Sequence, residues 1–227
     1  MKKILPLLFL ALSAATVVNL QAAPKRDDLI TDVDSCWAVL QDIMRSPGTA
    51  IPPQVWRRAR AILITNQFKG AIIIGVNGGY GVVMVKKPDG RWSLPVLVSD
   101  NGVSLGLQLG GKSIETVFIM TDDQTPRLLF KDRFNIGVDA KAIAGPLAAE
   151  AEQDNHPILS HPVLVYSKSA GLYAGATFKA AEVSRNDEAN FVLYNTSYEM
   201  PELLYSDWVQ PPNDVRGLMN YLQQLSP

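Results

Sequence analysis

The sequence of 227 residues is long enough for one domain with a substantial hydrophobic core. Hydrophobic residues make up 47% and charged residues 19%, which is typical of a globular chain and excludes a largely disordered one. The formal net charge of −1 argues against general nucleic-acid binding, and the single cysteine, Cys36, excludes an internal disulfide. Cys36 lies in an apolar-periodic stretch, so we predict a buried thiol.

The first 22 residues have the pattern of a signal peptide. Lys2 and Lys3 precede an apolar run from residue 4 to residue 18, which is short for a membrane span, and Ala22 suits cleavage by a signal peptidase. An uncleaved N-terminal anchor is the alternative. We expect an exported protein, periplasmic or secreted and peripheral to a membrane, whose mature part has 19 basic and 22 acidic residues.

Residues 23–50 are predicted to form an N-terminal amphipathic helix ahead of a domain at 51–227. Apolar residues recur at helical spacing between positions 27 and 45, and Ser46-Pro47-Gly48 ends the pattern. Pro52-Pro53 favours a second, short helix, because proline suits the first helical turn.

This short helix carries an aromatic residue, Trp56, beside three arginines, an arrangement that suits the headgroup region of an anionic membrane. The alternative is that Trp56 belongs to the core and the arginines form a solvated face. Residues 45–91 hold eight basic residues and one acid, whereas residues 92–227 hold 9 basic and 16 acidic residues. We therefore predict a lipid-binding surface on the basic segment, made by Trp56, Arg57, Arg58, Arg60, Lys69, Lys86 and Lys87.

Short runs rich in Val, Ile and Leu follow, separated by turn signals such as Pro88-Asp89-Gly90, and they predict antiparallel hairpins. The predicted strands are 61–65, 71–77, 79–87, 91–98, 102–110, 114–121, 162–169, 171–178 and 180–184. Helical patterns cover 126–135, 139–152, 186–196 and 213–225. The fold class is α+β: an antiparallel β-meander forming a sandwich or barrel-like core, flanked by N- and C-terminal helices.

One motif matches that of serine hydrolases. Residues 102–106 have the Gly-x-Ser-x-Gly pattern with Ser104 as nucleophile, and a triad with His161 and Asp139 would complete it. The residues that follow alternate leucine with glycine or glutamine, which favours a strand over the helix that this chemistry needs. The motif is therefore kept as an alternative, and we predict that the protein is not an enzyme.

Cofactor and metal motifs are weaker still. The glycine-rich residues 75–81 lack the Gly-Lys-Ser/Thr ending of a P-loop and favour a tight hairpin. Asp122-Asp123 does not begin an EF-hand loop, and the sequence has no His/Cys cluster for zinc. We predict that no cofactor and no metal is bound.

Six segments, in order along the chain, resemble the SYLF domain, the lipid-binding module also found in Ysc84-type actin-binding proteins. They are residues 61–64 leading into the glycine-rich 78–82, Trp92-Ser93-Leu94-Pro95, the Gly-x-Ser-x-Gly-x-Gln-x-Gly run 102–110, 116–120, 137–139 with 144–146, and 166–175. The resemblance covers roughly residues 50–195. Departures include Glu115 in place of Asp and Leu147 in place of glycine.

The resemblance implies binding to anionic phospholipids, which are phosphoinositides in eukaryotic members, and actin binding in some of those members. An exported bacterial-type member would meet no actin, so lipid binding is carried over and actin bundling is not. We expect non-catalytic binding of phosphoinositide-like headgroups at a membrane surface of the cell envelope. Two alternatives stay open: a serine hydrolase using Ser104, and an envelope structural protein without a lipid ligand.

Overall fold

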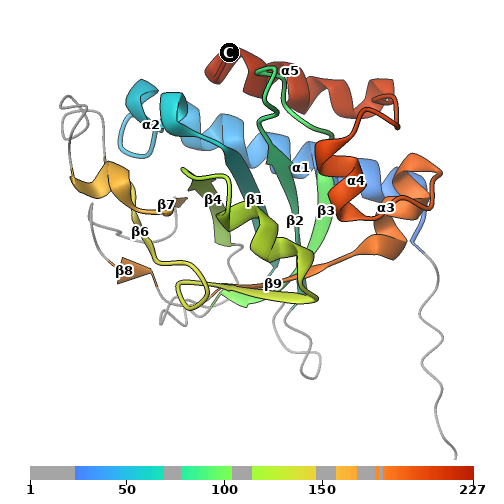
Figure 1. The fold of residues 1–227 in the computed structure, drawn as a ribbon, viewed down its shortest axis with the longest axis horizontal. Helices are drawn as coiled ribbons and strands as arrows, with labels where there is room; N and C mark the ends of the chain where they lie inside the picture. Colours follow the sequence, from blue (N-terminus) through green and yellow to red (C-terminus); the bar gives the residue numbers. More distant parts are fainter. Residues whose placement is uncertain (1–23, 69–77, 104–113, 147–156, 168–176, 179–180) are drawn as a thin grey trace, which may run out of the picture.

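The structure is a computed structural model of the chain, and it describes residues 24–68, 78–103, 114–146, 157–167, 177–178 and 181–227. A curved sheet forms its centre, and helices from both ends of the chain lie along one side of it (Figure 1). Among the described helices, none combines the length and the apolarity that crossing a bilayer requires.

The first helix, α1 (Arg26–Arg45), confirms the prediction for positions 27–45. Its buried residues recur every three or four positions and pack against the sheet: Leu29, Val33, Cys36, Val39, Leu40 and Ile43. The Cys36 thiol is fully buried, and this burial raises its pKa. Cys36 is therefore a core residue, as predicted.

The remaining helices are short. The first of them begins at the predicted position, with Pro52 as its N-cap residue and Pro53 as its first helical residue. They are α2 (Pro53–Arg58), α3 (Asp187–Tyr194), α4 (Met200–Tyr205) and α5 (Arg216–Leu225), with 3-10 turns η1 (Thr125–Phe130), η2 (Pro157–Ser160) and η3 (Asn213–Val215). The helical predictions near 186–196 and 213–225 are confirmed by α3 and by η3 with α5. The prediction for 126–135 holds only for its first half, because η1 ends at Phe130 and residues 133–136 form a strand.

The sheet has nine strands in the order β5-β9-β3-β2-β1-β4-β7-β6-β8 within the described residues. Their bounds are β1 (Ala61–Phe68), β2 (Gly78–Val85), β3 (Val96–Val103), β4 (Ile114–Met120), β5 (Arg133–Ile136), β6 (Ala142–Ala144), β7 (Val163–Ser167), β8 (Thr177–Phe178) and β9 (Ala181–Arg185). All neighbours pair antiparallel except β6 and β7. The predicted α+β class with a barrel-like, mostly antiparallel sheet is confirmed.

Strand order departs from a plain meander after β3. Strands β1, β2 and β3 are sequential neighbours, but β4 pairs with the opposite edge of β1, in a register that places Thr65 beside Thr116. The strand predicted at 91–98 also starts later than expected: β3 begins at Val96, directly after Pro95. Proline has no N–H to donate to a ladder, which explains this late start.

A further helix prediction needs correction, and one helix was not predicted. Residues 142–144, inside the helix predicted for 139–152, form strand β6, which is buried at every position and pairs with β7. Gly145 follows this strand and lies so close to the Tyr166 ring that an added Cβ would overlap the ring. The sequence analysis also missed α4, whose signal is the capping box of Glu199 and Glu202 with Pro201 in the first turn.

Asp32 on α1 makes stability depend on pH. Burial and, second, the neighbouring Asp28 raise the pKa of Asp32 to about 6. A carboxyl group with a raised pKa favours the folded state only when protonated, so stability falls as pH rises from about 4 to about 6. Above pH 6, we expect Asp32→Asn to raise the free energy of unfolding by about 1 kcal/mol, a value that allows for solvent screening. Near pH 4 we expect the substitution to leave the free energy of unfolding unchanged.

Urea unfolding of both chains at the two pH values measures this effect. Asp34→Asn, at an exposed position of the same helix, is the matched control. Equal gains from the two substitutions, or a gain for Asp32→Asn that is the same at both pH values, would show that the Asp32 carboxyl group is not the cause.

Candidate functional site

The predicted basic residues meet where α2 leads into β1. Arg57, Arg58 and Arg60 are exposed, while Val55, Trp56 and Ala59 between and before them are buried. Helix α2 is a single short piece with one apolar side, so its last turn directs the two guanidinium groups of Arg57 and Arg58 toward solvent.

Trp56 does not belong to this surface. Its side chain is only 3% exposed and packs into the hydrophobic core, which corrects the prediction of a ring placed among headgroups. The physical reason is that a six-residue helix can dock on the sheet only through its few apolar side chains, and Trp56 supplies the largest of them.

A hollow of about 430 Å³ lies beside the three arginines. Its far wall comes from the end of β4 and from η2, and its complete lining is Arg57, Arg58, Arg60, Thr121, Asp122, Leu159, Ser160 and Pro162. Three guanidinium groups around one solvent-accessible hollow suit an anion with several oxygen acceptors.

The acids near this hollow leave it basic. Asp122 already accepts hydrogen bonds from the backbone N–H groups of Gln124 (2.8 Å) and Thr125 (2.6 Å), so its carboxylate caps a turn. Asp123 lies 3.9 Å from the Arg60 Nε, and both side chains are more than half exposed. Such a long, exposed ion pair contributes little.

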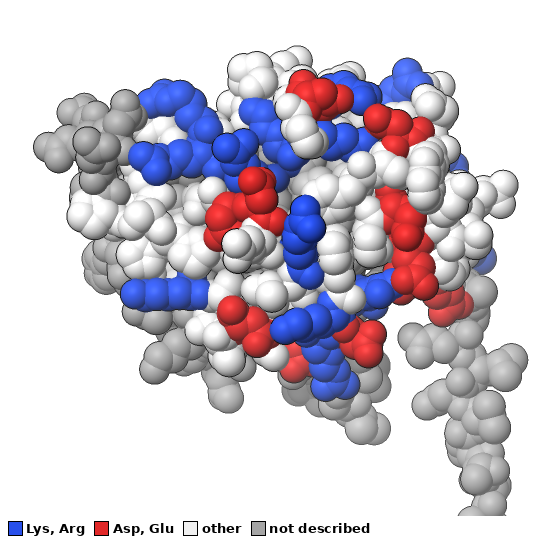
Figure 2. All heavy atoms as spheres, viewed as in Figure 1, with Lys and Arg blue, Asp and Glu red and all other residues white. Residues whose placement is uncertain are grey.

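Lys86 extends the basic region along the sheet. Its backbone N–H donates to the Arg60 carbonyl oxygen at 2.8 Å, and its Nζ donates to Ser226 Oγ (3.2 Å) and Pro227 O (2.6 Å). Burial and the nearby Arg60 lower the pKa of Lys86. Figure 2 shows Lys and Arg side chains gathered across the upper part of this face, from the α2 side toward the β2–β3 hairpin.

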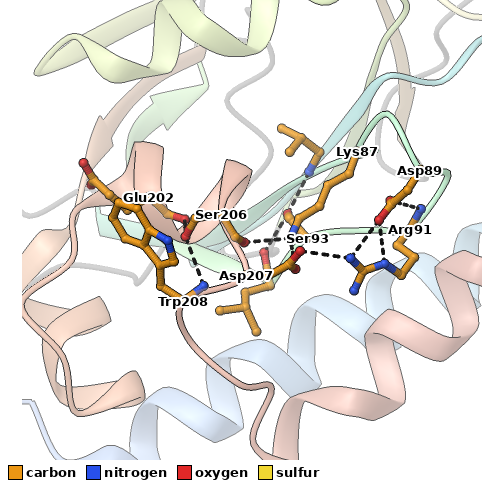
Figure 3. A network of polar contacts seen from close by, with 10 residues as sticks. Lys87, Asp89, Arg91, Ser93, Glu202, Ser206, Asp207 and Trp208 are labelled. Carbon is orange, nitrogen blue, oxygen red and sulfur yellow. Dashed lines mark hydrogen bonds and ion pairs between the residues drawn. The ribbon is translucent and has the colours of Figure 1, made fainter.

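Lys87, also predicted to bind lipid, is held by an acid instead. Its Nζ lies 2.7 Å from Asp207 Oδ1 and 2.7 Å from Ser206 O, and its side chain is 10% exposed. Arg91 contacts the other oxygen of Asp207 at 3.0 Å and Asp89 at 2.7 Å (Figure 3). Hydrogen bonds from Lys87 and Arg91 lower the pKa of Asp207, so the acid stays ionised.

The predicted surface is thus divided. Arg57, Arg58 and Arg60 share one hollow with Lys86 next to them, whereas Lys87 and its neighbour Arg91 are paired with Asp207. Lys69, the remaining predicted site residue, lies outside the described residues. No short-range signal points to Asp207, because it is 120 positions away from Lys87.

The sequence analysis also missed a buried support for α2. Ser226 is 2% exposed, and its hydroxyl donates to the Trp56 carbonyl oxygen at 2.9 Å. Its own carbonyl oxygen accepts from the Trp92 indole N–H at 3.1 Å. These bonds tie the last residues of the chain to α2 and so help to place the arginines that follow Trp56.

The described residues do not supply the catalytic triad of the serine-hydrolase alternative. Ser104 lies outside the described residues, and so does most of the glycine-rich run 75–81. The Asp139 carboxylate accepts a hydrogen bond from its own turn, from the Asn135 N–H at 2.7 Å. The described part of the chain holds no group of three or more His, Cys, Asp or Glu residues that would suit a metal ion.

Comparison with known proteins decides the family. The profile of Ysc84, described as "Las17-binding protein actin regulator", matches residues 101–225, more than half of the chain. The chain belongs to the Ysc84 family. The resemblance found in the sequence motifs is thereby confirmed.

Ysc84-family relatives are similar over most of this chain. The SH3 domain-containing YSC84-like protein 1 of Bos taurus is 27% identical over 166 residues, which are 73% of this chain and 49% of the relative. The LAS seventeen-binding protein 3 of Saccharomyces cerevisiae strain S288c is 28% identical over 176 residues, 76% of this chain and 38% of the relative. The chain therefore spans half or less of the length of the curated relatives it matches.

Proposed function

We propose that this Ysc84-family chain is a non-catalytic binding module for anionic phospholipid, acting at a membrane surface of the cell envelope after export. The observation that carries the proposal is the hollow of about 430 Å³ bordered by Arg57, Arg58 and Arg60. Headgroup phosphates, phosphoinositide-like ones included, would lie in this hollow. The N-terminal apolar run supports the export part of the proposal.

The chemistry of the hollow favours phosphate over other ligands. Guanidinium groups form paired, charge-assisted hydrogen bonds with phosphate oxygens. Ser160 and Thr121 line the same hollow, but their hydroxyl groups already donate to the Pro157 and His161 carbonyl oxygens at 2.6 and 2.7 Å. The donors available to a phosphate are therefore the arginines. Near an anionic membrane each exposed cation contributes about 1 kcal/mol, so the three arginines together contribute about 3 kcal/mol, enough for reversible, peripheral binding.

Co-sedimentation with vesicles tests the proposal. We expect the purified chain to pellet with vesicles of phosphatidylcholine and phosphatidylserine but not with phosphatidylcholine alone. Binding should weaken steeply with salt, because the screening length falls from about 10 Å at 0.1 M to about 3 Å at 1 M. Equal pelleting with both kinds of vesicle, or no effect of salt, would overturn the proposal.

The family description supplies a second candidate, because it names actin regulation. The same experiment therefore includes an arm with actin filaments in place of vesicles. Pelleting with filaments and not with anionic vesicles would favour a protein ligand for the basic surface.

A further inference from the structure

We propose that Lys87 and Arg91 form a second anion-binding subsite, which the carboxylate of Asp207 occupies and which a further phosphate group of an anionic membrane takes over. This inference rests on the proposed function and deepens it. It adds a subsite whose own counter-ion restricts binding to surfaces dense in phosphate.

The geometry around Asp207 is that of a bound anion. One carboxylate oxygen lies 2.7 Å from Lys87 Nζ and the other 3.0 Å from an Arg91 nitrogen. Figure 3 shows the Asp207 side chain reaching from the α4 side toward the β2–β3 hairpin, where both cations meet it. A phosphate group offers the same pair of acceptor oxygens and at least one more.

The subsite is accessible from solvent. Lys87, Arg91 and Asp207 line a hollow of about 240 Å³ whose other walls include the apolar side chains of Trp92 and Leu94. Asp207 and Arg91 have side chains about 60% exposed. An incoming phosphate can therefore approach Arg91 directly, whereas it reaches the largely buried Lys87 only by taking the place of the Asp207 carboxylate.

Asp207 can leave without unfolding its segment. The segment is anchored next to it by Ser206, whose hydroxyl donates to the Glu202 carbonyl oxygen at 2.6 Å and accepts from the Trp208 N–H at 3.3 Å. A phosphate of similar charge would replace Asp207 as the partner of the largely buried Lys87, so the exchange leaves neither cation unpaired. Asp207 is thus an exchangeable counter-ion on a fixed support.

The two subsites are connected through the backbone of neighbouring basic residues. Lys87 follows Lys86, whose backbone is hydrogen-bonded to Arg60 at the rim of the larger hollow. Occupation of the arginine hollow would bring the membrane surface to the hairpin, where its phosphates would compete with Asp207. Binding should therefore rise more than proportionally with the anionic lipid content.

Asp207→Asn tests the subsite. We expect it to tighten binding to phosphatidylcholine–phosphatidylserine vesicles about tenfold, between the fivefold expected for one released cation and the roughly thirtyfold expected for two. The matched control is Asp214→Asn, which removes an equally charged, 43% exposed acid that pairs with Arg26 at 2.8 Å. Equal gains from the two variants would overturn the proposal.

A double variant and a soluble probe complete the test. Arg91→Gln in the Asp207→Asn chain should remove most of the gain, and a gain that persists would overturn the subsite. Inorganic phosphate, added as a competitor, separates free phosphate from lipid: vesicle binding should survive millimolar phosphate if the membrane supplies the anion. One outcome separates the two proposals: neither chain binds vesicles, but Asp207→Asn binds inorganic phosphate more tightly than the unchanged protein. The proposed function then fails, and the membrane is not the source of the anion. The Lys87–Arg91 pair is still shown to bind phosphate.

Discussion

Replacing Arg57, Arg58 and Arg60 together by glutamine is expected to weaken binding to anionic vesicles about a hundredfold. Each cation near an anionic surface contributes about 1 kcal/mol, and the three line one hollow, so their losses should nearly add. Glutamine removes the charge and keeps a polar side chain, and because the three positions are exposed the replacement removes little packing. Co-sedimentation over a range of lipid concentrations measures the change.

The matched control removes the same three charges elsewhere. Lys25, Lys131 and Arg133 are exposed cations in the described part of the chain that do not line the hollow, and their triple replacement by glutamine lowers the net charge equally. We expect it to reduce binding only a few-fold, through the long-range field. If both triple variants lose binding to the same degree, net charge and not the arginine hollow is responsible.

Trp56→Ala is expected to lower the free energy of unfolding by about 3 to 5 kcal/mol. The ring is 3% exposed and is the main apolar contact of α2 with the core, so its removal leaves a large cavity. Urea unfolding followed by far-UV circular dichroism measures the loss without relying on tryptophan fluorescence. A loss this large is a substantial part of the stability of an ordinary domain.

Trp56→Phe is the conservative partner of this variant. The Trp56 indole N–H has no hydrogen-bond partner within the described residues, so phenylalanine removes volume but no bond there. We expect less than half of the effect of alanine and unchanged binding to vesicles. If Trp56→Ala instead abolished vesicle binding while leaving stability intact, the ring would have to act at the membrane surface, against its burial.

Trp56 is buried while the arginines that follow it are exposed, and this difference shows how far local sequence can be interpreted. The sequence Trp56-Arg57-Arg58 is compatible with an interfacial aromatic beside cations and with a core aromatic beside a solvated face. Which one is realised depends on how α2 docks, and that docking depends on partners far along the chain, such as Ser226 bonded to the Trp56 carbonyl oxygen. Three arginines remained in the site because long charged side chains stay solvated under either arrangement.

Strand β6 illustrates the same limit in the fold. Residues 142–144 have small, apolar side chains that suit a helix as well as a strand. Their pairing with β7 and the close approach of Gly145 to Tyr166 select the strand. Neither contact has a signal in the local sequence, because both join residues about twenty positions apart.

By itself, the sequence determined what depends on neighbouring residues: the amphipathic helix α1, the proline-started α2, the hairpin before Trp92, the α+β class, and the family motifs. Tertiary structure alone decided which of the clustered basic residues line the arginine hollow and which are held by Asp207. Hydrophobic and turn patterns act over a few residues, whereas the pairing of Lys87 with Asp207 joins positions 120 apart. Charge is additive along a chain, but the field at a surface depends on which opposite charge the fold brings beside it.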